Sequence, residues 1–198
     1  MSLEGKNLSF AYRRQGRVLE KLSLTLEPGE RVGLTGASGR GKTTLCRLLA
    51  GYERPDRGEV LLDGRPLGRW RGLCPVQMIW QHPETAVDPL LRLRDTLSEA
   101  GGVEAGLLEA LHIQPGWLDR YPAELSGGEL QRFCIARALT PGVRYLLCDE
   151  MTAMLDPITQ AQIWKLLLEQ AEGRRLGLLI VSHDSSLLQR LCTRVQTL

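Results

Sequence analysis

The chain has 198 residues, of which 43% are hydrophobic and 24% are charged. This length and composition are typical of one folded domain and exclude long disordered or fibrous stretches. Its 25 basic and 23 acidic residues are spread along the chain, so the charge gives no sign of a nucleic-acid partner. Because there is no apolar run of 18 residues and no apolar N-terminal stretch, we expect neither a membrane span nor a signal peptide. Five cysteines without metal-ligand spacing indicate buried, reduced thiols in a cytosolic protein.

The N-terminal part of the chain alternates between strand-like segments and turns. The predicted strands cover residues 8–12, 18–26, 31–35 and 59–62. The last of these ends at Asp63-Gly64, a pair typical of tight hairpin turns. A helix is predicted over residues 41–50, where Gly51 ends it. The sequence therefore mixes antiparallel strands with one strand-loop-helix unit.

Residues 83–121 have a different character. Leu90–Glu99 and Glu104–Ile113 show helical spacing of Leu and Ala, and glycine and proline pairs interrupt them. We interpret this region as an inserted helical subdomain.

The last third of the chain predicts a parallel sheet. Residues 145–148 and 178–181 are short apolar runs, as in central strands covered on both faces. Between them a helix is predicted, with Asp156 as its N-cap and Pro157 in its first turn. Its apolar stripe is expected to consist of Ile158, Ala161, Trp164 and Leu168. Strand, helix and strand in this order form a right-handed parallel crossover.

A glycine-rich loop follows the predicted strand 31–35 and precedes the helix. It reads Gly36, Ala37, Ser38, Gly39, Arg40, Gly41, Lys42, Thr43, and Thr44 comes next. This pattern lets consecutive backbone N–H groups converge on phosphates at the positive end of the helix. Lys42 would contact the β- and γ-phosphates, and the Thr43 hydroxyl would bind Mg²⁺. The loop predicts ATP binding.

Two carboxylates follow the apolar strand at 145–148. Asp149 and Glu150 would lie at the carboxyl edge of the sheet, where such sheets bind their ligands. Asp149 is expected to hold Mg²⁺, and Glu150 to polarise the attacking water.

A second anion-binding helix start is predicted at Ser126, Gly127, Gly128 and Glu129, with Ser126 as N-cap. One triphosphate would contact helix starts of both kinds only if the second came from another subunit.

Together these motifs resemble those of the nucleotide-binding subunit of an ATP-binding-cassette (ABC) transporter, over essentially the whole chain. Residues 36–43 are similar to the Walker A loop, 125–129 to the signature motif, and 145–150 to the Walker B strand with its catalytic glutamate. Further matches are Gln81 to the Q-loop glutamine, Asp156 to the D-loop aspartate, His183 to the switch histidine and Tyr12 to the aromatic that stacks on adenine. The resemblance implies that Gln81 binds Mg²⁺ and that His183 contacts the γ-phosphate. His82 and His112 are given no role.

The resemblance also implies a fold, partners and a location. The fold would be a P-loop NTPase with a parallel core sheet, an N-terminal antiparallel β subdomain and an inserted α-helical subdomain, divided into a core of residues 1–82 and 122–198 and a helical part of residues 83–121. Two such chains would sandwich ATP head to tail, beneath transmembrane permease subunits on the cytoplasmic face of the membrane. The stretch 81–92 resembles subunits of the dipeptide, oligopeptide and nickel import group. That group implies an extracytoplasmic substrate-binding protein.

Two alternatives stay open at this point. A soluble ABC ATPase of DNA repair or translation would need no permease, and a phosphate-binding module without turnover would need damage at Glu150 or His183. Both of these residues are intact. One departure from the family is Met151, where proline commonly follows the catalytic glutamate; it puts the rigidity of that loop in question.

Overall fold

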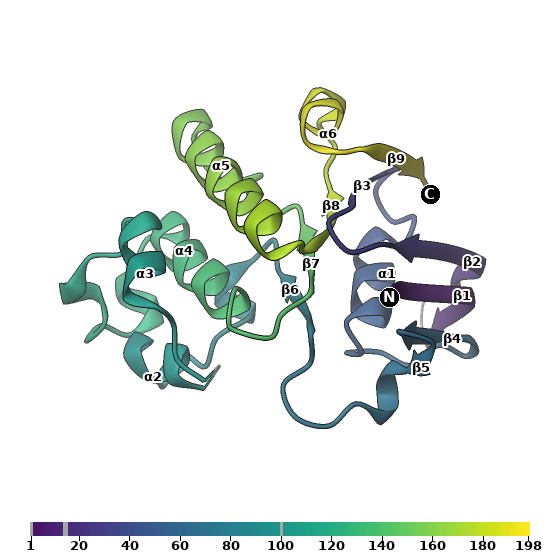
Figure 1. Cartoon of the computed structure of the whole chain (residues 1–198), viewed down its shortest axis with the longest axis horizontal. Helices are drawn as coiled ribbons and strands as arrows, with labels where there is room; N and C mark the ends of the chain where they lie inside the picture. The colour runs from purple at the N-terminus through teal and green to yellow at the C-terminus, as the bar shows by residue number, and fades with distance from the viewer. Residues whose placement is uncertain (1, 14–15, 100) are drawn as a thin grey trace.

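The computed structural model describes residues 2–13, 16–99 and 101–198 and arranges them around two β-sheets (Figure 1). The larger sheet has five parallel strands in the order β6-β7-β8-β3-β9. Its strands are β3 (Arg31–Thr35), β6 (Val76–Ile79), β7 (Tyr145–Asp149), β8 (Gly177–Val181) and β9 (Arg194–Thr197). The predicted α/β fold with a parallel core sheet is therefore confirmed.

The smaller sheet is antiparallel, with strand order β2-β1-β4-β5. Its strands are β1 (Leu3–Tyr12), β2 (Gly16–Leu26), β4 (Arg57–Leu62) and β5 (Arg65–Pro66). Asp63 and Gly64 both have positive φ and form the predicted hairpin turn. β1 begins earlier than predicted, because a left-handed Asn7 and a register shift after Gly5 interrupt the alternation of its side chains.

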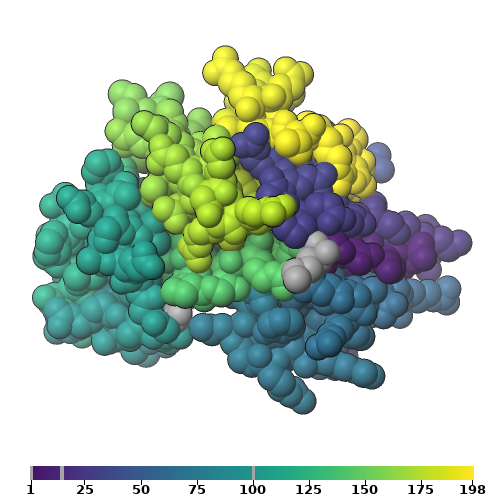
Figure 2. Space-filling view, in the orientation of Figure 1, coloured from purple at the N-terminus to yellow at the C-terminus, as the bar shows by residue number. Residues whose placement is uncertain are grey.

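The helices gather at one end of the molecule and over the parallel sheet. They are α1 (Lys42–Leu49), α2 (Leu93–Ser98), α3 (Ala105–Ala110), α4 (Gly127–Ala138), α5 (Pro157–Arg174) and α6 (Ser185–Leu191). Short 3-10 turns are η1 (Leu67–Arg69), η2 (Pro83–Thr85), η3 (Pro115–Trp117) and η4 (Pro122–Glu124). Figure 1 places α2, α3 and α4 at the end opposite the antiparallel sheet, and Figure 2 shows the same separation on the surface, with teal at one end and purple at the other.

Two cores lie on the two faces of the parallel sheet. Side chains alternate along a strand, so Leu146 and Cys148 of β7 pack on the face covered by α4 and α5, with Phe133 and Leu167. Tyr145 and Leu147 pack on the other face, which α1 and the antiparallel sheet cover. This burial on both faces explains why β7 and β8 are continuous apolar runs.

The predicted apolar stripe of α5 is wrong in its first two members. Ile158 is 72% exposed and Ala161 is exposed, whereas Trp164 is buried as predicted. The buried side chains of the helix are Ile163, Trp164, Leu166, Leu167 and Ala171. The sequence of α5 contains apolar residues on neighbouring sides of the helix, so its pattern allows more than one apolar stripe. Packing against the sheet buries the stripe that begins at Ile163.

The helical region also begins later and is shorter than predicted. α2 starts at Leu93 and leaves Leu90 82% exposed, because the Asp88 carboxylate accepts the Leu90 N–H and forms a turn there. α3 ends at Ala110, before the left-handed His112.

The C-terminal part contains two elements that were not predicted, α6 and β9. Both are short, with seven and four residues, so neither carries a long periodic pattern. Of the cysteines, Cys46, Cys134 and Cys148 are buried as expected, but Cys74 and Cys192 are partly exposed; all five are free thiols. Among the helices of residues 2–13, 16–99 and 101–198, none has both the length and the apolarity to cross a bilayer.

Candidate active site

One cavity of about 380 Å³ collects residues that lie far apart in the chain. It is lined by Tyr12, Val18, Ser38, Gly39, Gly41, Lys42, Thr43, Thr44, Gln81, Glu150 and His183. The loop after β3, the carboxyl end of β7 and the residues after β8 all meet there. In parallel sheets, this edge is where ligands bind.

The glycine-rich loop is held close to the antiparallel sheet. Gly41 is the N-cap of α1 with φ of 92°, and a Cβ there would lie 2.8 Å from a methyl carbon of Val18. Only glycine combines this φ with this close approach. Val18 was not predicted as a site residue, because it is an ordinary strand residue whose place beside the loop follows only from the packing of β2.

Lys42 is buried within the loop. Its Nζ donates to the Gly36 carbonyl at 2.8 Å and to the Ala37 carbonyl at 3.2 Å, and the residue is 6% exposed. The ammonium group is therefore hydrogen-bonded to the loop backbone and can contact an anion in the cavity. Arg40 is exposed and does not line the cavity.

Tyr12 lines the cavity beside the loop. Its hydroxyl lies 3.5 Å from Thr44 Oγ1 and accepts a long hydrogen bond of 3.4 Å from Arg47. Phe10 packs edge-on against the ring at a centroid distance of 4.8 Å. These contacts fix the ring beside the loop, where a flat aromatic ligand group can stack on it.

Glu150 and His183 face each other at the sheet edge. His183 Nε2 lies 2.8 Å from Glu150 Oε1. Glu150 has a positive φ of 49°, and its N–H donates to the Val181 carbonyl at 3.2 Å. This sharp turn directly after β7 aims the carboxylate into the cavity instead of along the strand.

Asp149 lies behind the cavity and is 3% exposed. Burial raises the pKa of this carboxyl above its ordinary value, while a hydrogen bond with the Thr43 side chain opposes the rise and the neighbouring Glu150 charge adds to it. The arrangement couples the carboxylate to the loop hydroxyl, and a nearby cation would stabilise its charged form.

The loop after Glu150 is firmly anchored despite Met151. Met151 is 3% exposed and belongs to the core on the α4 and α5 face. Thr152 Oγ1 accepts from Gln160 Nε2 at 2.9 Å and from Trp164 Nε1 at 3.1 Å. Buried packing and these hydrogen bonds restrain the loop without a proline.

The second predicted anion site lies outside the cavity. Ser126 is exposed; its Oγ accepts from the Glu129 N–H at 3.3 Å, and the Glu129 carboxylate accepts from the Ser126 N–H at 2.7 Å. Asp156 is the N-cap of α5 and accepts from the N–H groups of Ile158 and Thr159. Of the predicted residues, the cavity thus gathers Tyr12, residues 38–39 and 41–44, Gln81, Glu150 and His183, whereas Ser126–Glu129 and Asp156 lie outside it.

The family model described as "ABC transporter" matches residues 19–153, which include the loop, Gln81, Ser126 and Glu150. The chain belongs to the ABC transporter family. Two relatives support the assignment. The nickel import ATP-binding protein NikE of Rhodospirillum rubrum is 41% identical over 90% of this chain and 71% of the relative. The nickel import system ATP-binding protein NikE of Staphylococcus aureus is 34% identical over 98% of this chain and 84% of the relative.

Solved ABC structures share the fold. The structure of an ATP-binding subunit of an ABC transporter is 26% identical, with a TM-score of 0.87 over 100% of this chain and 86% of that chain. The dimeric cassette MJ0796 is 24% identical and has a TM-score of 0.83. The match covers 99% of this chain and 94% of that chain. As an ABC cassette, this chain binds nucleotide and is the ATPase subunit of a transporter.

Proposed function

We propose that this ABC ATPase powers the import of nickel ions or a nickel chelate. The two relatives named above are both described as nickel import proteins. The stretch from Gln81 to Arg92 independently resembles the dipeptide, oligopeptide and nickel group. On this proposal, the chain sits on the cytoplasmic face of the membrane beneath permease subunits, and an extracytoplasmic binding protein delivers the substrate.

Within the cavity we assign each residue a role in ATP hydrolysis. Tyr12 stacks on adenine, and the backbone of residues 36–44 with Lys42 surrounds the phosphates. Glu150 is the general base: its carboxylate accepts a proton from the water that attacks the γ-phosphorus. His183 orients the Glu150 carboxylate through the 2.8 Å contact of its Nε2, and with ATP bound the same nitrogen would contact the γ-phosphate instead.

The residues beside the loop fit Mg²⁺. Thr43, Asp149 and Gln81 offer a hydroxyl, a carboxylate and an amide oxygen, which are hard ligands of the kind Mg²⁺ prefers. When bound, Mg²⁺ would neutralise charge on the β- and γ-phosphates.

The exposed N-terminal end of α4, the helix that begins with the signature motif, supports a site shared between two chains. Ser126 and Asp156 lie outside the cavity, so their helix starts are free to meet the nucleotide of a second copy. The solved cassette MJ0796 is described as dimeric. We therefore propose a head-to-tail dimer with a second ATPase subunit, in which the helical part, residues 83–121, moves together with α4 relative to the parallel sheet.

The single observation that carries the ATPase mechanism is the cavity that brings Lys42, Gln81, Glu150 and His183 together. The cargo needs a separate test. The tagged chain is purified with the membrane subunits that bind it and reconstituted in proteoliposomes. We expect ATP-dependent uptake of radioactive nickel, lost in Glu150→Gln. Uptake of a dipeptide without nickel would overturn the nickel assignment, and a tagged chain that associates with ribosomes or DNA instead would overturn the transport function.

A further inference from the structure

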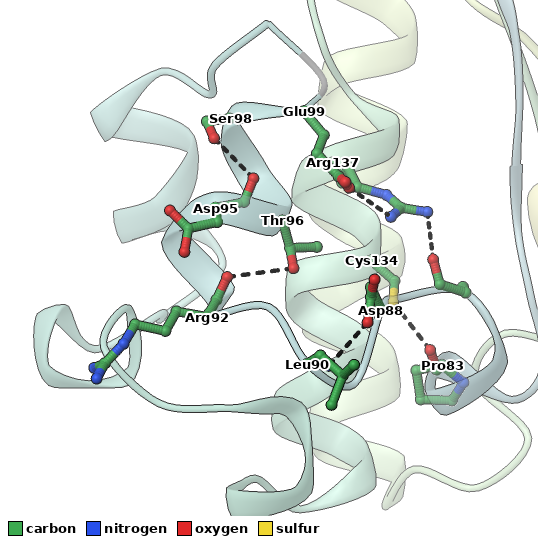
Figure 3. A network of polar contacts seen from close by, with 11 residues as sticks. Pro83, Asp88, Leu90, Arg92, Asp95, Thr96, Ser98, Glu99, Cys134 and Arg137 are labelled. Carbon is green, nitrogen blue, oxygen red and sulfur yellow. Dashed lines mark hydrogen bonds and ion pairs between the residues drawn. The ribbon is translucent and has the colours of Figure 1, made fainter.

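The segment that follows β6 is attached to α4 at three evenly spaced points. Gln131 Nε2 donates to the Trp80 carbonyl at 3.1 Å, Cys134 Sγ to the Pro83 carbonyl at 3.7 Å, and Arg137 Nη2 to the Ala86 carbonyl at 2.6 Å. Figure 3 shows Cys134 and Arg137 of α4 pointing toward the segment that contains Pro83. The donors and the acceptors are both three residues apart, so the two segments run in register.

This spacing puts the three donors on one side of α4. Residues three apart are neighbours on a helix surface, because the helix has 3.6 residues per turn. Arg137 also lies 3.9 Å from Glu99 at the end of α2, which adds a weak ion pair to the outer end of the row. Three side-chain hydrogen bonds therefore attach residues 80–86 to α4.

Trp80 is held by both sides of the molecule. Its carbonyl binds α4 through Gln131, while the Arg47 guanidinium of α1 lies 5.2 Å from its ring centre, and Tyr52 packs edge-on at 5.2 Å. α1 begins at the nucleotide loop, and Gln81 follows Trp80 directly. Trp80 thus links α1 to α4 beside the cavity.

The buried amide of Gln131 does not maximise the stability of the fold. The residue is 2% exposed, and its Oε1 is buried with no hydrogen-bond partner among residues 2–13, 16–99 and 101–198. An apolar side chain of similar size would avoid this unpaired oxygen. The amide is explained by the hydrogen bond that it donates to Trp80.

We propose that Gln131, Cys134 and Arg137 are positioning residues that fasten the Gln81 segment to α4, so that a displacement of Gln81 by ATP carries Ser126 with it. Ser126 caps the same helix, about 7.5 Å along its axis from Gln131 at 1.5 Å per residue. None of these three side chains lines the cavity. They determine the position of α4 relative to the cavity when ATP is bound. This inference rests on the proposed roles of Gln81 and Ser126.

The test uses the full chain with Gln131→Met and Arg137→Met, singly and combined. Arg132→Met is the matched control, since Arg132 also donates from α4 to a backbone carbonyl, that of Leu111, at 2.8 Å, but not to the Gln81 segment. Steady-state kcat and KM for ATP are measured, and nucleotide Kd and ATP-driven dimerisation are measured in a Glu150→Gln background. We expect the double variant to lose about 5- to 150-fold in kcat and in dimerisation, with the ATP Kd of the separate chain within about twofold.

Rescue and stability separate positioning from folding. Arg137→Lys keeps a donor for the Ala86 carbonyl and should recover part of the loss. Melting temperatures should show equal folding of the double variant and the control at the assay temperature; if the double variant unfolds, the two single variants give the same comparison.

Two outcomes would overturn the proposal: a double variant that matches Arg132→Met in kcat and dimerisation, or one whose ATP Kd weakens as much as its kcat/KM falls. The variant Gln81→Ala separates a failure of the proposed attachment to α4 from a failure of the proposed role of Gln81. If Gln81→Ala slows turnover and the double variant does not, only the attachment to α4 is wrong. If Gln81→Ala also behaves like the wild type, the proposed role of Gln81 itself is wrong.

Discussion

Glu150 and His183 come from the ends of two adjacent strands, and their side chains meet with Nε2 2.8 Å from Oε1. The left-handed backbone at Glu150 makes this contact possible, since it turns the chain sharply after β7. The Glu150 side chain is only 17% exposed, and the contact with the imidazole restricts the orientation of its carboxylate.

Glu150→Gln should bind ATP with a Kd close to the wild-type value and lose about 10²- to 10⁴-fold in kcat, because a carboxamide cannot accept the proton of the attacking water. Calorimetry and a phosphate-release assay measure the two quantities. Glu172→Gln, an exposed change on α5, is the control. Turnover at the wild-type rate in Glu150→Gln would exclude Glu150 as the general base.

Lys42→Met should weaken ATP binding by about 10- to 150-fold, since a hydrogen bond to a charged group contributes about 1.5–3 kcal/mol. The nucleotide-free protein should also melt earlier, because the carbonyls of Gly36 and Ala37 lose the donor that they share. Calorimetry with a non-hydrolysable analogue and a thermal scan measure both effects. Unchanged affinity would contradict the role given to Lys42.

Tyr12→Phe should leave ATP affinity within about twofold, because the contacts of its hydroxyl to Thr44 and Arg47 are long. Tyr12→Ala should weaken binding by about 5- to 150-fold, as expected when a base loses its aromatic platform. Equal affinities of the Phe and Ala variants would show that the ring does not stack on adenine. The comparison uses fluorescence titration with a labelled ATP analogue.

Asp149 and Asp63 should give opposite pH dependences of stability. Burial raises the pKa of Asp149 above its ordinary 3.8, so the folded state binds its proton more tightly than the unfolded state does. The stabilisation from the protonated form is complete below about pH 3.8 and is lost as pH rises through the raised pKa. Asp149→Asn should therefore raise Tm near pH 7 in the absence of nucleotide, and this gain should shrink in acid.

Asp63 provides the matched comparison. Hydrogen bonds of 2.7 and 2.9 Å from Arg144 lower the pKa of Asp63, so its stabilisation is present above about pH 3.8 and is lost as pH falls through the lowered pKa. Asp63→Asn should lower Tm near pH 7 by an amount that disappears in acid; the pair is partly exposed, so the effect should be about 1 kcal/mol or less. Thermal scans from pH 3 to pH 8 compare both variants, and shifts of the same sign would contradict these assignments.

Local sequence signals determined most of the single elements of this protein. The Asp63-Gly64 turn, the Ser126 and Asp156 caps and the glycine-rich loop all formed as predicted, because each depends on backbone geometry and hydrogen bonds within a few residues. The continuous apolar composition of β7 and β8 likewise predicted that both faces of these strands are buried.

Only the tertiary structure decided how these elements meet. The stripe of α5, the place of Val18 against the loop and the in-register attachment of residues 80–86 to α4 depend on contacts between segments far apart in the chain. The Glu150–His183 contact depends on the pairing of β7 with β8 and on a left-handed turn that no residue-type preference would suggest for glutamate. Residue patterns thus named the chemical groups, while the packing of the sheet and its helices fixed which groups share one cavity.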